Sequence, residues 1–412
     1  MGNNYKPEIR FSEFTDAWEQ RELSDVAQIS SGGTPNRKKS SYWNGTVPWV
    51  TTAEVNYSLI TDTNEKITLE GLNSSSAKLL PIGTILMAMY GQGKTRGKVA
   101  ILGIEATTNQ ANANIVVTPI VNNLFIYYQL EKQYEILRNL ANEGGQANLS
   151  LGIIKNIPMF VSSNLSEQEK IGDLFKQFDH LITLHQRKLD NAKKLKAGFL
   201  QKMFPRNGES FPEIRFPGFT DAWEQRQLNE YLTTSKVKNR DEQFGKEDVL
   251  SVSGDFGIVN QIEFQGRSFA GVSVAPYGVV ETGDVVYTKS PLKSNPFGII
   301  KTNKGQAGIV STLYAVYKPN DNVDSIFVER YFENDQRLNR YLKPLVNKGA
   351  KNDMKVSDDN ALIGTVVFPV EVDEQRKISS FFNQLENLIT LHQRELDGLK
   401  ETKKAFLQKM FV

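Results

Sequence analysis

The heptapeptide LITLHQR occurs twice in this sequence of 412 residues, at Leu181–Arg187 and at Leu388–Arg394. Each copy opens a longer repeat. The stretch LITLHQRKLDNAKKLKAGFLQKMF (Leu181–Phe204) returns as LITLHQRELDGLKETKKAFLQKMF (Leu388–Phe411), and 17 of the 24 letters agree. Agreement of this length within one chain indicates either a tandem duplication of the whole chain or a single mechanical part that is used twice.

A second repeated pair supports duplication of the whole chain. PEIRFSEFTDAWEQREL (Pro7–Leu23) returns as PEIRFPGFTDAWEQRQL (Pro212–Leu228), with 14 of 17 letters identical. Between the repeats the identity is low, but the apolar runs PIGTILMAMY (Pro81–Tyr90) and ETGDVVYTKS (Glu281–Ser290) occupy corresponding places. Each half is therefore predicted to be a variable globular domain followed by a nearly constant helix.

The constant segments carry apolar residues at steps of three and four, which is the pattern of one helix face. A helix of about 40 residues rises about 60 Å, and so long and narrow a stripe requires a partner helix, most simply the other copy. His185 and His392 fall on this stripe, either as neutral side chains in the seam or as pH-sensing or ligand groups. The predicted seam consists of Leu174, Phe178, Leu181, His185 and Leu189 in the first helix and of Phe381, Leu385, Leu388, His392 and Leu396 in the second.

The predicted fold class is α+β. Two mixed α/β domains, rich in short β-type runs with Gly, Pro and Asn turns, are separated by two long antiparallel coiled-coil helices in a pseudo-twofold internal repeat. The predicted segments are an N-terminal repeat segment (1–17), a first variable domain (18–163), a first long helix (164–204), a linker (205–222), a second variable domain (223–371) and a second long helix (372–412).

The composition excludes several classes of site. The chain is 39% hydrophobic and 23% charged, as soluble globular proteins are. It has no cysteine, which excludes disulfides, thiolate metal sites and cysteine nucleophiles, and its three histidines argue against a metal site. No apolar run suggests a signal peptide or a membrane span, so a cytoplasmic location is expected. The net charge of +2 means that nucleic acid would have to be bound by local patches.

Motifs for catalysis are incomplete, and no catalytic residue is predicted. GQGKTRG (Gly91–Gly97) lacks the first glycine of a phosphate-binding loop, since Ala88 stands where that glycine is required. SNPFG (Ser294–Gly298) lacks the second proline of an amino-methyltransferase motif. Glu401 and Lys403 form an E-x-K pair, but they lie on the predicted second helix.

Three windows carry Lys or Arg but neither Asp nor Glu: residues 71–104, 285–320 and 336–352. Two of them occupy corresponding places in the two variable domains. Lys and Arg neutralise phosphates, and Arg, Lys, Gln and Asn can read base edges; the alternative is a set of ordinary solvated loops. A further basic segment, SGGTPNRKKSSYWNGTVPWVTTAEV (Ser31–Val55), contains Trp43 and Trp49, which either belong to the core or stack on bases. The candidate DNA-binding residues are Arg37, Lys38, Lys39, Tyr90, Gln92, Lys94, Arg96, Lys98, Lys289, Ser290, Lys293, Asn295, Lys301, Lys304, Lys348 and Lys351.

Several motifs carry a resemblance to a known family. LSLGIIKNIPMFVSSNLSEQEKI (Leu149–Ile171) is echoed by VDEQRKI (Val372–Ile378), and FLQKMF ends both long helices. GGTP (Gly32–Pro35), followed by YWNGTVPWVT (Tyr42–Thr51), is similar to the opening of many first target-recognition domains. Over essentially its whole length the chain resembles the specificity (S) subunit of type I restriction–modification systems. The second domain lacks the GGTP turn, so its reading loops cannot be assigned by motif.

The resemblance implies a non-catalytic subunit of a methyltransferase and restriction complex. Each variable domain would read one half of a bipartite target in double-stranded DNA, and the paired helices would set the spacing and dock two modification subunits. S-adenosylmethionine, ATP and Mg would be bound by the modification and restriction subunits, and no cofactor is expected in this chain. The residues alone leave two alternatives open: a coiled-coil scaffold that assembles proteins without reading DNA, and a nucleotide-dependent enzyme.

Overall fold

A computed structural model describes residues 5–91, 95–140, 148–292, 294–348 and 354–412, without the side chains at 140, 347, 348, 354 and 355. The chain divides into two compact units. The first unit combines Met1–Gln186 with Arg394–Val412, and the second unit is Arg187–Gln393. Each unit thus contains one variable domain and parts of both long helices, so the units cut across the six predicted segments, whose boundaries stay a prediction.

The first unit is built on a five-stranded sheet. Its strand order is β2-β9-β6-β7-β4, with antiparallel neighbours except for the parallel pair β4–β7. Strand β6 lies in the middle of the order, and its four residues are all buried. The strands are β2 (Ala27–Ser31), β9 (Asn112–Val117), β6 (Ile85–Ala88), β7 (Val99–Leu102) and β4 (Leu59–Ile60).

The second unit repeats the core of this sheet. Its four-stranded sheet has the order β12-β19-β16-β17, which matches β2-β9-β6-β7 strand for strand. The predicted correspondence of the two apolar runs is confirmed, because β6 and β16 derive from them and take equivalent places. The strands are β12 (Leu232–Thr234), β19 (Tyr314–Pro319), β16 (Val285–Thr288) and β17 (Ile300–Thr302).

Smaller elements surround these sheets and differ more between the units. In each unit a strand of the repeat segment forms an antiparallel ribbon with the strand that precedes a long helix, β1–β10 in the first and β11–β22 in the second. The remaining strands form the sheet β5-β3-β8 in the first unit and the pairs β13–β14, β15–β18 and β20–β21 in the second. Their bounds are β1 Glu19–Glu22, β3 Trp43–Val50, β5 Glu65–Ile67, β8 Thr107–Thr108, β10 Pro158–Val161, β11 Glu224–Gln227, β13 Leu250–Ser253, β14 Gly257–Asn260, β15 Gly278–Val280, β18 Gly308–Val310, β20 Asn347–Lys348, β21 Met354–Lys355 and β22 Thr365–Phe368.

Short helices flank the sheets, and two of them follow one another closely in each unit, α3 with α4 and α8 with α9. The α-helices are α1 Leu23–Val26, α2 Leu69–Asn73, α3 Asn123–Lys132, α4 Tyr134–Leu140, α5 Leu151–Lys155, α7 Gln261–Gln265, α8 Ser325–Phe332 and α9 Asp335–Leu342. Short 3₁₀ turns lie at Ser40–Tyr42, Thr52–Glu54, Leu228–Glu230, Lys246–Asp248 and Asp359–Leu362.

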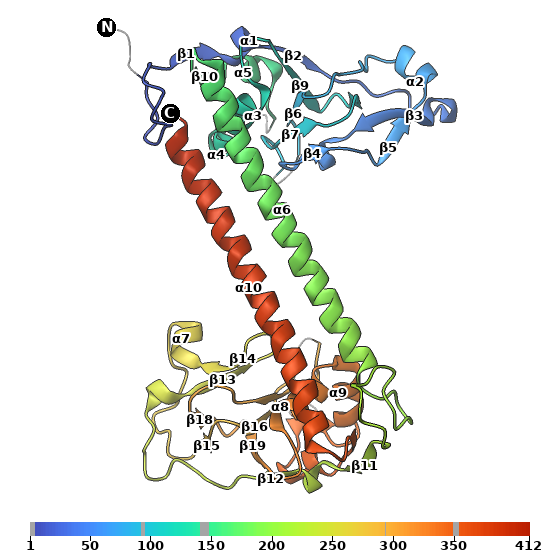
Figure 1. Ribbon diagram of the computed structural model, residues 1–412, viewed down its shortest axis with the longest axis vertical. Coiled ribbons are helices and arrows are strands. Elements are labelled where there is room, and N and C mark those ends of the chain that lie inside the picture. The colour runs from blue at the N-terminus through green and yellow to red at the C-terminus, as the bar shows by residue number, and fades with distance from the viewer. Residues whose placement is uncertain (1–4, 92–94, 141–147, 293, 349–353) are drawn as a thin grey trace. The chain divides into compact units, whose positions relative to one another are not determined.

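The two long helices, α6 (Leu165–Lys202) and α10 (Val372–Met410), are the longest elements of the chain (Figure 1). Within the first unit, Asp179 pairs with Lys403 and His185 lies 2.9 Å from Glu395, so residue numbers rise on α6 as they fall on α10. Within the second unit, Lys196 pairs with Glu386 and Phe199 packs on Phe381 in the same antiparallel sense. The predicted antiparallel pairing is therefore confirmed in each unit. Among the described residues, no helix is long and apolar enough to cross a membrane.

The buried line along these helices differs from the predicted seam. Leu189 and Leu396 are buried as expected, but Leu181 and Leu388 are 39% and 42% exposed. Phe175, which the predicted seam omits, is completely buried and stacks on Phe411 with ring centroids 5.6 Å apart. Residues that follow a 3.5-residue repeat rotate around a straight α-helix by about 20° per heptad. A single line of such residues over ten turns therefore moves off the buried face of the helix. The other seam residues, partly buried, are Leu174, Phe178, His185, Phe381, Leu385 and His392.

A buried carboxylate fastens each repeat segment to the start of a long helix. Glu167 accepts two hydrogen bonds from Arg10, at 2.5 and 2.9 Å, and one from the Trp18 indole at 3.2 Å. In the second unit, Glu374 accepts hydrogen bonds from Arg215 at 2.7 and 2.8 Å and from the Trp223 indole at 3.3 Å.

The neighbouring glutamines, Gln168 and Gln375, are equivalent as well. Their amide oxygens accept from the backbone N–H of Asn122 and of Asp324, both at 2.8 Å, where α3 and α8 begin. The two-letter EQ motif of both repeats is thus a structural clamp, defined here as Glu167 with Gln168 and Glu374 with Gln375.

A lysine from one long helix enters a pair of acids in each unit. Lys403 lies 2.7 Å from both Glu131 and Asp179 in the first unit. In the second unit, Lys196 pairs with Glu333 and, at 2.9 Å, with Glu386. Because the lysine and both acids are equivalent in the two copies, the duplicated lysine specifies how the helices align with α3 and α8.

The second unit adds a guanidinium to this cluster. Arg330 is completely buried and pairs with Glu333 and Glu386, whereas the equivalent Tyr128 donates a hydrogen bond to Asp179 at 2.7 Å. Burial alone would raise the pKa of Glu386, but the hydrogen bonds and charges of Arg330 and Lys196 bring it to about 2. In the first unit burial prevails, and it raises the pKa of Glu131 despite Lys403.

Replacing Phe175 tests the buried line on α6. Phe175→Ala is expected to lower the free energy of unfolding by about 3–5 kcal/mol, because it removes a buried ring from contacts with Phe411 and Tyr128. Leu181→Ala on the same helix, at an exposed position, is expected to cost much less. Chemical denaturation of both variants is the measurement, and equal losses would contradict the observed seam.

Acid titration tests the Arg330 cluster. A pKa depressed from 4.5 to about 2 contributes stability that is complete above pH 4.5 and is lost as the pH falls toward 2. The free energy of unfolding of Glu386→Gln should therefore fall less steeply than that of the unaltered chain across this window. Parallel pH profiles for the two proteins would show that Glu386 is not held ionised by Arg330.

Candidate nucleic-acid interface

The basic loop between β2 and β3 is held in place by aromatic rings. The Arg37 guanidinium lies 3.7 Å from the centre of the Trp43 ring and 4.7 Å from that of Trp49, and it pairs with Glu65 at 2.7 Å. The Trp49 indole donates to the Gly33 carbonyl at 2.9 Å. Trp49 is buried and Trp43 is partly buried, so both rings support the loop.

Lys38 and Lys39 extend from this loop into solvent. Both side chains are exposed. The Lys39 ammonium donates to the Tyr42 hydroxyl at 2.9 Å, and this hydrogen bond raises the pKa of Lys39. The loop thus presents two adjacent cations and is supported by packed aromatic side chains.

The GGTP turn beside this loop has a packing role. A Cβ atom on Gly32 would lie 2.1 Å from the Thr108 carbonyl oxygen, and one on Gly33 would lie 2.3 Å from the Ala77 backbone nitrogen. Both contacts are far shorter than real Cβ atoms allow, so the two glycines are required for close approach of the backbone.

The turn after β6 contains only part of the predicted cation cluster. Tyr90 is 44% exposed. Arg96 is buried and donates to the Arg138 carbonyl at 3.1 Å, and the Lys98 ammonium donates to the Asn56 side chain at 2.6 Å. Arg96 therefore fastens this turn to α4. Gln92 and Lys94 lie outside the described residues.

In the second unit, the equivalent loop is bound to nearby acids. Lys289 pairs with Asp358 at 2.5 Å, and buried Asn295 donates to Asp335 at 2.8 Å. Ser290 is partly buried. Lys293, Lys351 and the side chain of Lys348 lie outside the described part of the chain.

Lys301 of β17 and Lys304, which follows that strand, are likewise paired with an acid from a later part of the sequence. Lys301 and Lys304 lie 3.9 and 3.1 Å from Glu329 of α8, whose carboxylate also accepts the Thr302 backbone N–H at 3.1 Å. A stretch of sequence that lacks acidic residues can therefore still lie beside acidic residues in the folded chain. Arg37, Lys38, Lys39 and Tyr90 are the exposed candidates among the described side chains of the first unit, whereas in the second unit Lys304 alone is exposed, and it is paired.

An exposed aromatic surface in the second unit was missed by the sequence analysis. Phe256 and Phe264 lie beside the β13–β14 hairpin and α7 with ring centroids 5.3 Å apart, and Arg267 lies over Phe269. All three phenylalanines are exposed. Their irregular spacing in the sequence gives no periodic signal, although several phenylalanines in a Gly- and Ser-rich segment could have indicated a surface cluster.

Comparison with known proteins finds similarity to specificity proteins of type I restriction–modification systems. The family model for the type I restriction modification DNA specificity domain matches residues 15–194. The Type I restriction enzyme MjaIX specificity subunit of Methanocaldococcus jannaschii is 25% identical over 233 residues, which are 54% of this chain and 53% of that protein. The chain is thus similar in sequence to specificity subunits of type I restriction–modification systems.

Other similar proteins are specificity subunits as well. The Escherichia coli EcoR124I/EcoR124II specificity subunit is 27% identical over 43% of this chain and 45% of its own length, so these first two matches span about half of each relative. The putative MjaX specificity subunit of M. jannaschii is 22% identical over 98% of this chain and 95% of its length. The crystal structure of the S subunit from M. genitalium has the same fold, with a TM-score of 0.63 at 15% identity over 99% of both chains.

Removing the Arg37 guanidinium tests whether it orders the β2–β3 loop. Arg37→Ala is expected to change the near-ultraviolet circular dichroism of the tryptophans and to cost about 0.5–1 kcal/mol, since the cation lies over two indole rings at a partly exposed site. Arg37→Lys keeps the charge but loses the planar stack, and should show most of the same spectral change. An unaltered spectrum for Arg37→Ala would contradict this role.

Proposed function

We propose that this chain is the DNA sequence-specificity subunit of a type I restriction–modification complex. The observation that carries the proposal is the repetition of one sheet order, β2-β9-β6-β7 and β12-β19-β16-β17, in two units whose smaller sheets and loops differ. A constant core with different surfaces suits two domains that each read a different half of a bipartite target. Base edges are read by side chains whose placement depends on local loops, so different loops select different bases.

In this proposal the loop that carries Lys38 and Lys39 contacts the phosphates of the first half-site. Both lysines are exposed, and the Lys39 ammonium donates its hydrogen bond to the Tyr42 hydroxyl and not to a carboxylate. The three lysines Lys289, Lys301 and Lys304 pair with acids of their own unit and contribute less. For the second half-site, the exposed phenylalanines beside α7 offer apolar contact area.

The chemistry of the complex would belong to other subunits. Two modification subunits would bring S-adenosylmethionine and methylate adenine, and restriction subunits would use ATP and Mg to translocate and cleave DNA. This chain would place both domains on one duplex and set the distance between them through the paired helices α6 and α10. It would perform no catalytic step itself.

Genome-wide mapping of methylated adenines tests the proposal. The chain, co-expressed with the modification subunit of its own system in a host without other adenine methylation, should yield one bipartite motif with a fixed spacer. Exchange of residues 18–163 for the variable domain of another such chain should change only one half of the motif. Absence of a motif, together with no salt-dependent DNA binding by the complex, would favour the scaffold alternative.

The loop lysines make a quantitative prediction. Each phosphate contact contributes about 0.9 to the slope of log affinity against log salt, so the Lys38→Ala/Lys39→Ala variant should have a slope smaller by about 1–2. Its affinity should fall for every DNA sequence, while the recognised motif stays the same. Lys301→Ala, which removes a lysine already paired with Glu329, serves as the matched control and should leave the slope unchanged.

A further inference from the structure

The loop that precedes β9 in the first unit has a counterpart before β19 in the second unit. In the first sheet Asn112, which begins β9, is opposite Ala88 at the end of β6. In the second sheet Tyr314, which begins β19, is opposite Thr288 at the end of β16. The edge loops that precede these two strands therefore occupy equivalent places, and they consist of Asn109–Ala111 and Ser311–Leu313.

Two backbone hydrogen bonds hold both edge loops in the same way. The last carbonyl of the loop accepts the N–H of the residue that follows β6 or β16, and the first carbonyl accepts the N–H of the residue that begins β9 or β19. The backbone of the edge loop is therefore part of the duplicated frame. The donor–acceptor pairs are Met89–Ala111 at 2.9 Å and Asn112–Asn109 at 3.3 Å in the first unit, and Lys289–Leu313 at 3.0 Å and Tyr314–Ser311 at 3.1 Å in the second.

The middle residue of the edge loop differs between the units although the backbone does not. It is Gln110 in the first unit and Thr312 in the second, and both side chains are exposed. Because neither side chain fills a core, packing does not explain the choice of residue. A fixed backbone with a different exposed side chain in each unit suits a position that contacts a different ligand in each unit.

The Gln110 side chain is oriented by the GGTP turn. The Thr34 hydroxyl donates a hydrogen bond to the amide oxygen of Gln110. The turn itself is fastened to the strand before the edge loop, since the Gly33 N–H donates to the Thr108 carbonyl at 2.8 Å. The bond from Thr34 uses one lone pair of the amide oxygen and leaves the second lone pair and both amide N–H groups for a ligand. A side chain that is already oriented loses less conformational freedom when it binds.

Cations and an exposed aromatic ring lie at the same edge of the sheet as Gln110. Strand β9 runs antiparallel to β2 and β6, so its start lies beside the ends of both strands. Lys38 and Lys39 belong to the loop that follows β2, and Tyr90 belongs to the turn that follows β6. This edge therefore combines lysines, which contact phosphates, with an amide, which can contact the edge of a base.

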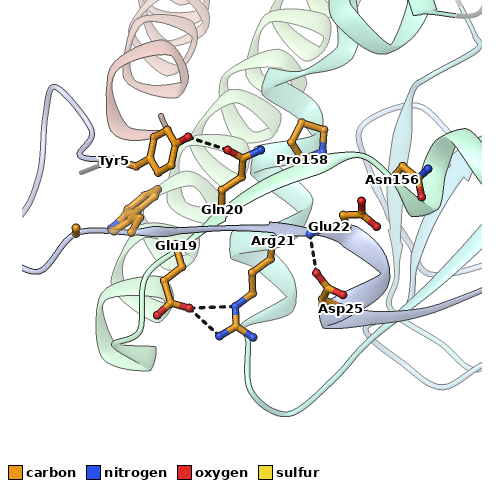
Figure 2. Close-up of a pocket in the computed structure, with 10 residues that line it drawn as sticks. Tyr5, Glu19, Gln20, Arg21, Glu22, Asp25, Asn156 and Pro158 are labelled. Atoms are coloured by element: carbon orange, nitrogen blue, oxygen red, sulfur yellow. Dashed lines mark hydrogen bonds and ion pairs between the residues drawn. The ribbon is translucent and has the colours of Figure 1, made fainter. Parts of the chain in front are cut away.

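The hollow beside β1 is unsuited to DNA by comparison. It has a volume of about 1050 Å³, and Glu19, Glu22 and Asp25 line it together with the cation Arg21. Figure 2 shows Arg21 bonded to Glu19, and Asp25 bonded to the backbone N–H of Glu22. The excess of carboxylates repels the phosphates of a duplex. The sheet edge that carries Gln110 is therefore the better place for DNA on the first unit.

We propose that the middle residue of each edge loop reads a base, and that Gln110 reads an adenine of the first half-site. A glutamine amide can accept a hydrogen bond from adenine N6 and donate one to N7 at the same time. Thr312 offers a hydroxyl and a methyl group, which suit a thymine in the second half-site. Thr34 is a positioning residue that acts through Gln110. The inference rests on the proposed function and names the residues that select the base.

A reciprocal exchange of the two side chains tests the inference. Gln110→Thr and Thr312→Gln are each introduced into the full chain, which is co-expressed with the modification subunit of its own system, and methylated adenines are mapped across the genome. Gln110→Thr should remove the adenine preference at one position of the first half of the motif and leave the second half as it is. Thr312→Gln should change one position of the second half alone.

Binding to a panel of duplexes gives the size of the effect. The panel carries each of the four bases in turn at each position of the motif. For the complex with Gln110→Thr, discrimination between adenine and the other bases should fall about 10–100-fold at one position. The slope of log affinity against log salt should stay the same, because neither glutamine nor threonine carries a charge.

Two substitutions of Thr34 test its positioning role. Thr34→Val keeps the shape of the side chain but removes the hydroxyl, and it should weaken discrimination at the same base as Gln110→Thr. Thr34→Ser keeps the hydroxyl and should retain the discrimination of the unaltered chain. An equal loss for both variants, or a loss spread over every position of the motif, would contradict the positioning role.

The outcomes separate this inference from the proposed function. An unchanged motif with either exchanged residue, or an equal loss of affinity for all four bases at every position, would overturn the inference and leave the proposed function standing. Absence of a bipartite motif for the unaltered chain would count against the proposed function itself.

Discussion

The carboxylate of the clamp is the interaction on which each unit depends. Glu167 and Glu374 are almost fully buried, and each is satisfied by one arginine and one indole from a repeat segment far away in the sequence. A buried carboxylate without partners is strongly unfavourable, and removal of one member of such a pair costs about 3–5 kcal/mol. The repeat segments are therefore alike in the two halves because both hold the carboxylate of a clamp. This contact determines where a long helix leaves its domain.

The second duplicated constraint is the lysine that enters an acidic pair from the neighbouring long helix. Lys403 and Lys196 occupy equivalent places, but their surroundings have diverged. In the second unit, Arg330 holds the acids ionised, whereas in the first unit the Tyr128 hydroxyl occupies the equivalent place. A lysine common to both copies thus keeps the alignment of the helices, while the charges around this lysine differ between the copies. This is expected if the position of the helices is constrained and the charge around the lysine is not.

Local signals in the sequence account for some of the candidate interface residues but not for others. Lys38, Lys39 and Arg37 were proposed from a local cluster, and the structure places them together on one ordered loop because aromatic residues within the same short segment pack under them. Lys301 and Lys304 were proposed from the same kind of signal, but their acid, Glu329, lies on a helix that returns from later in the chain. Arg96 was proposed as a surface cation and is buried against α4.

The duplication, the two long helices and the correspondence between their domains follow from the amino-acid sequence, because repeats and helical periodicity are local properties of the chain. The sequence also carries the family motifs. The buried face of each helix and the set of neutralised cations depend on the folded chain, since helical drift over many turns moves that face. Ion pairs join residues far apart in sequence, so the folded chain determines the charge that a surface presents to a partner.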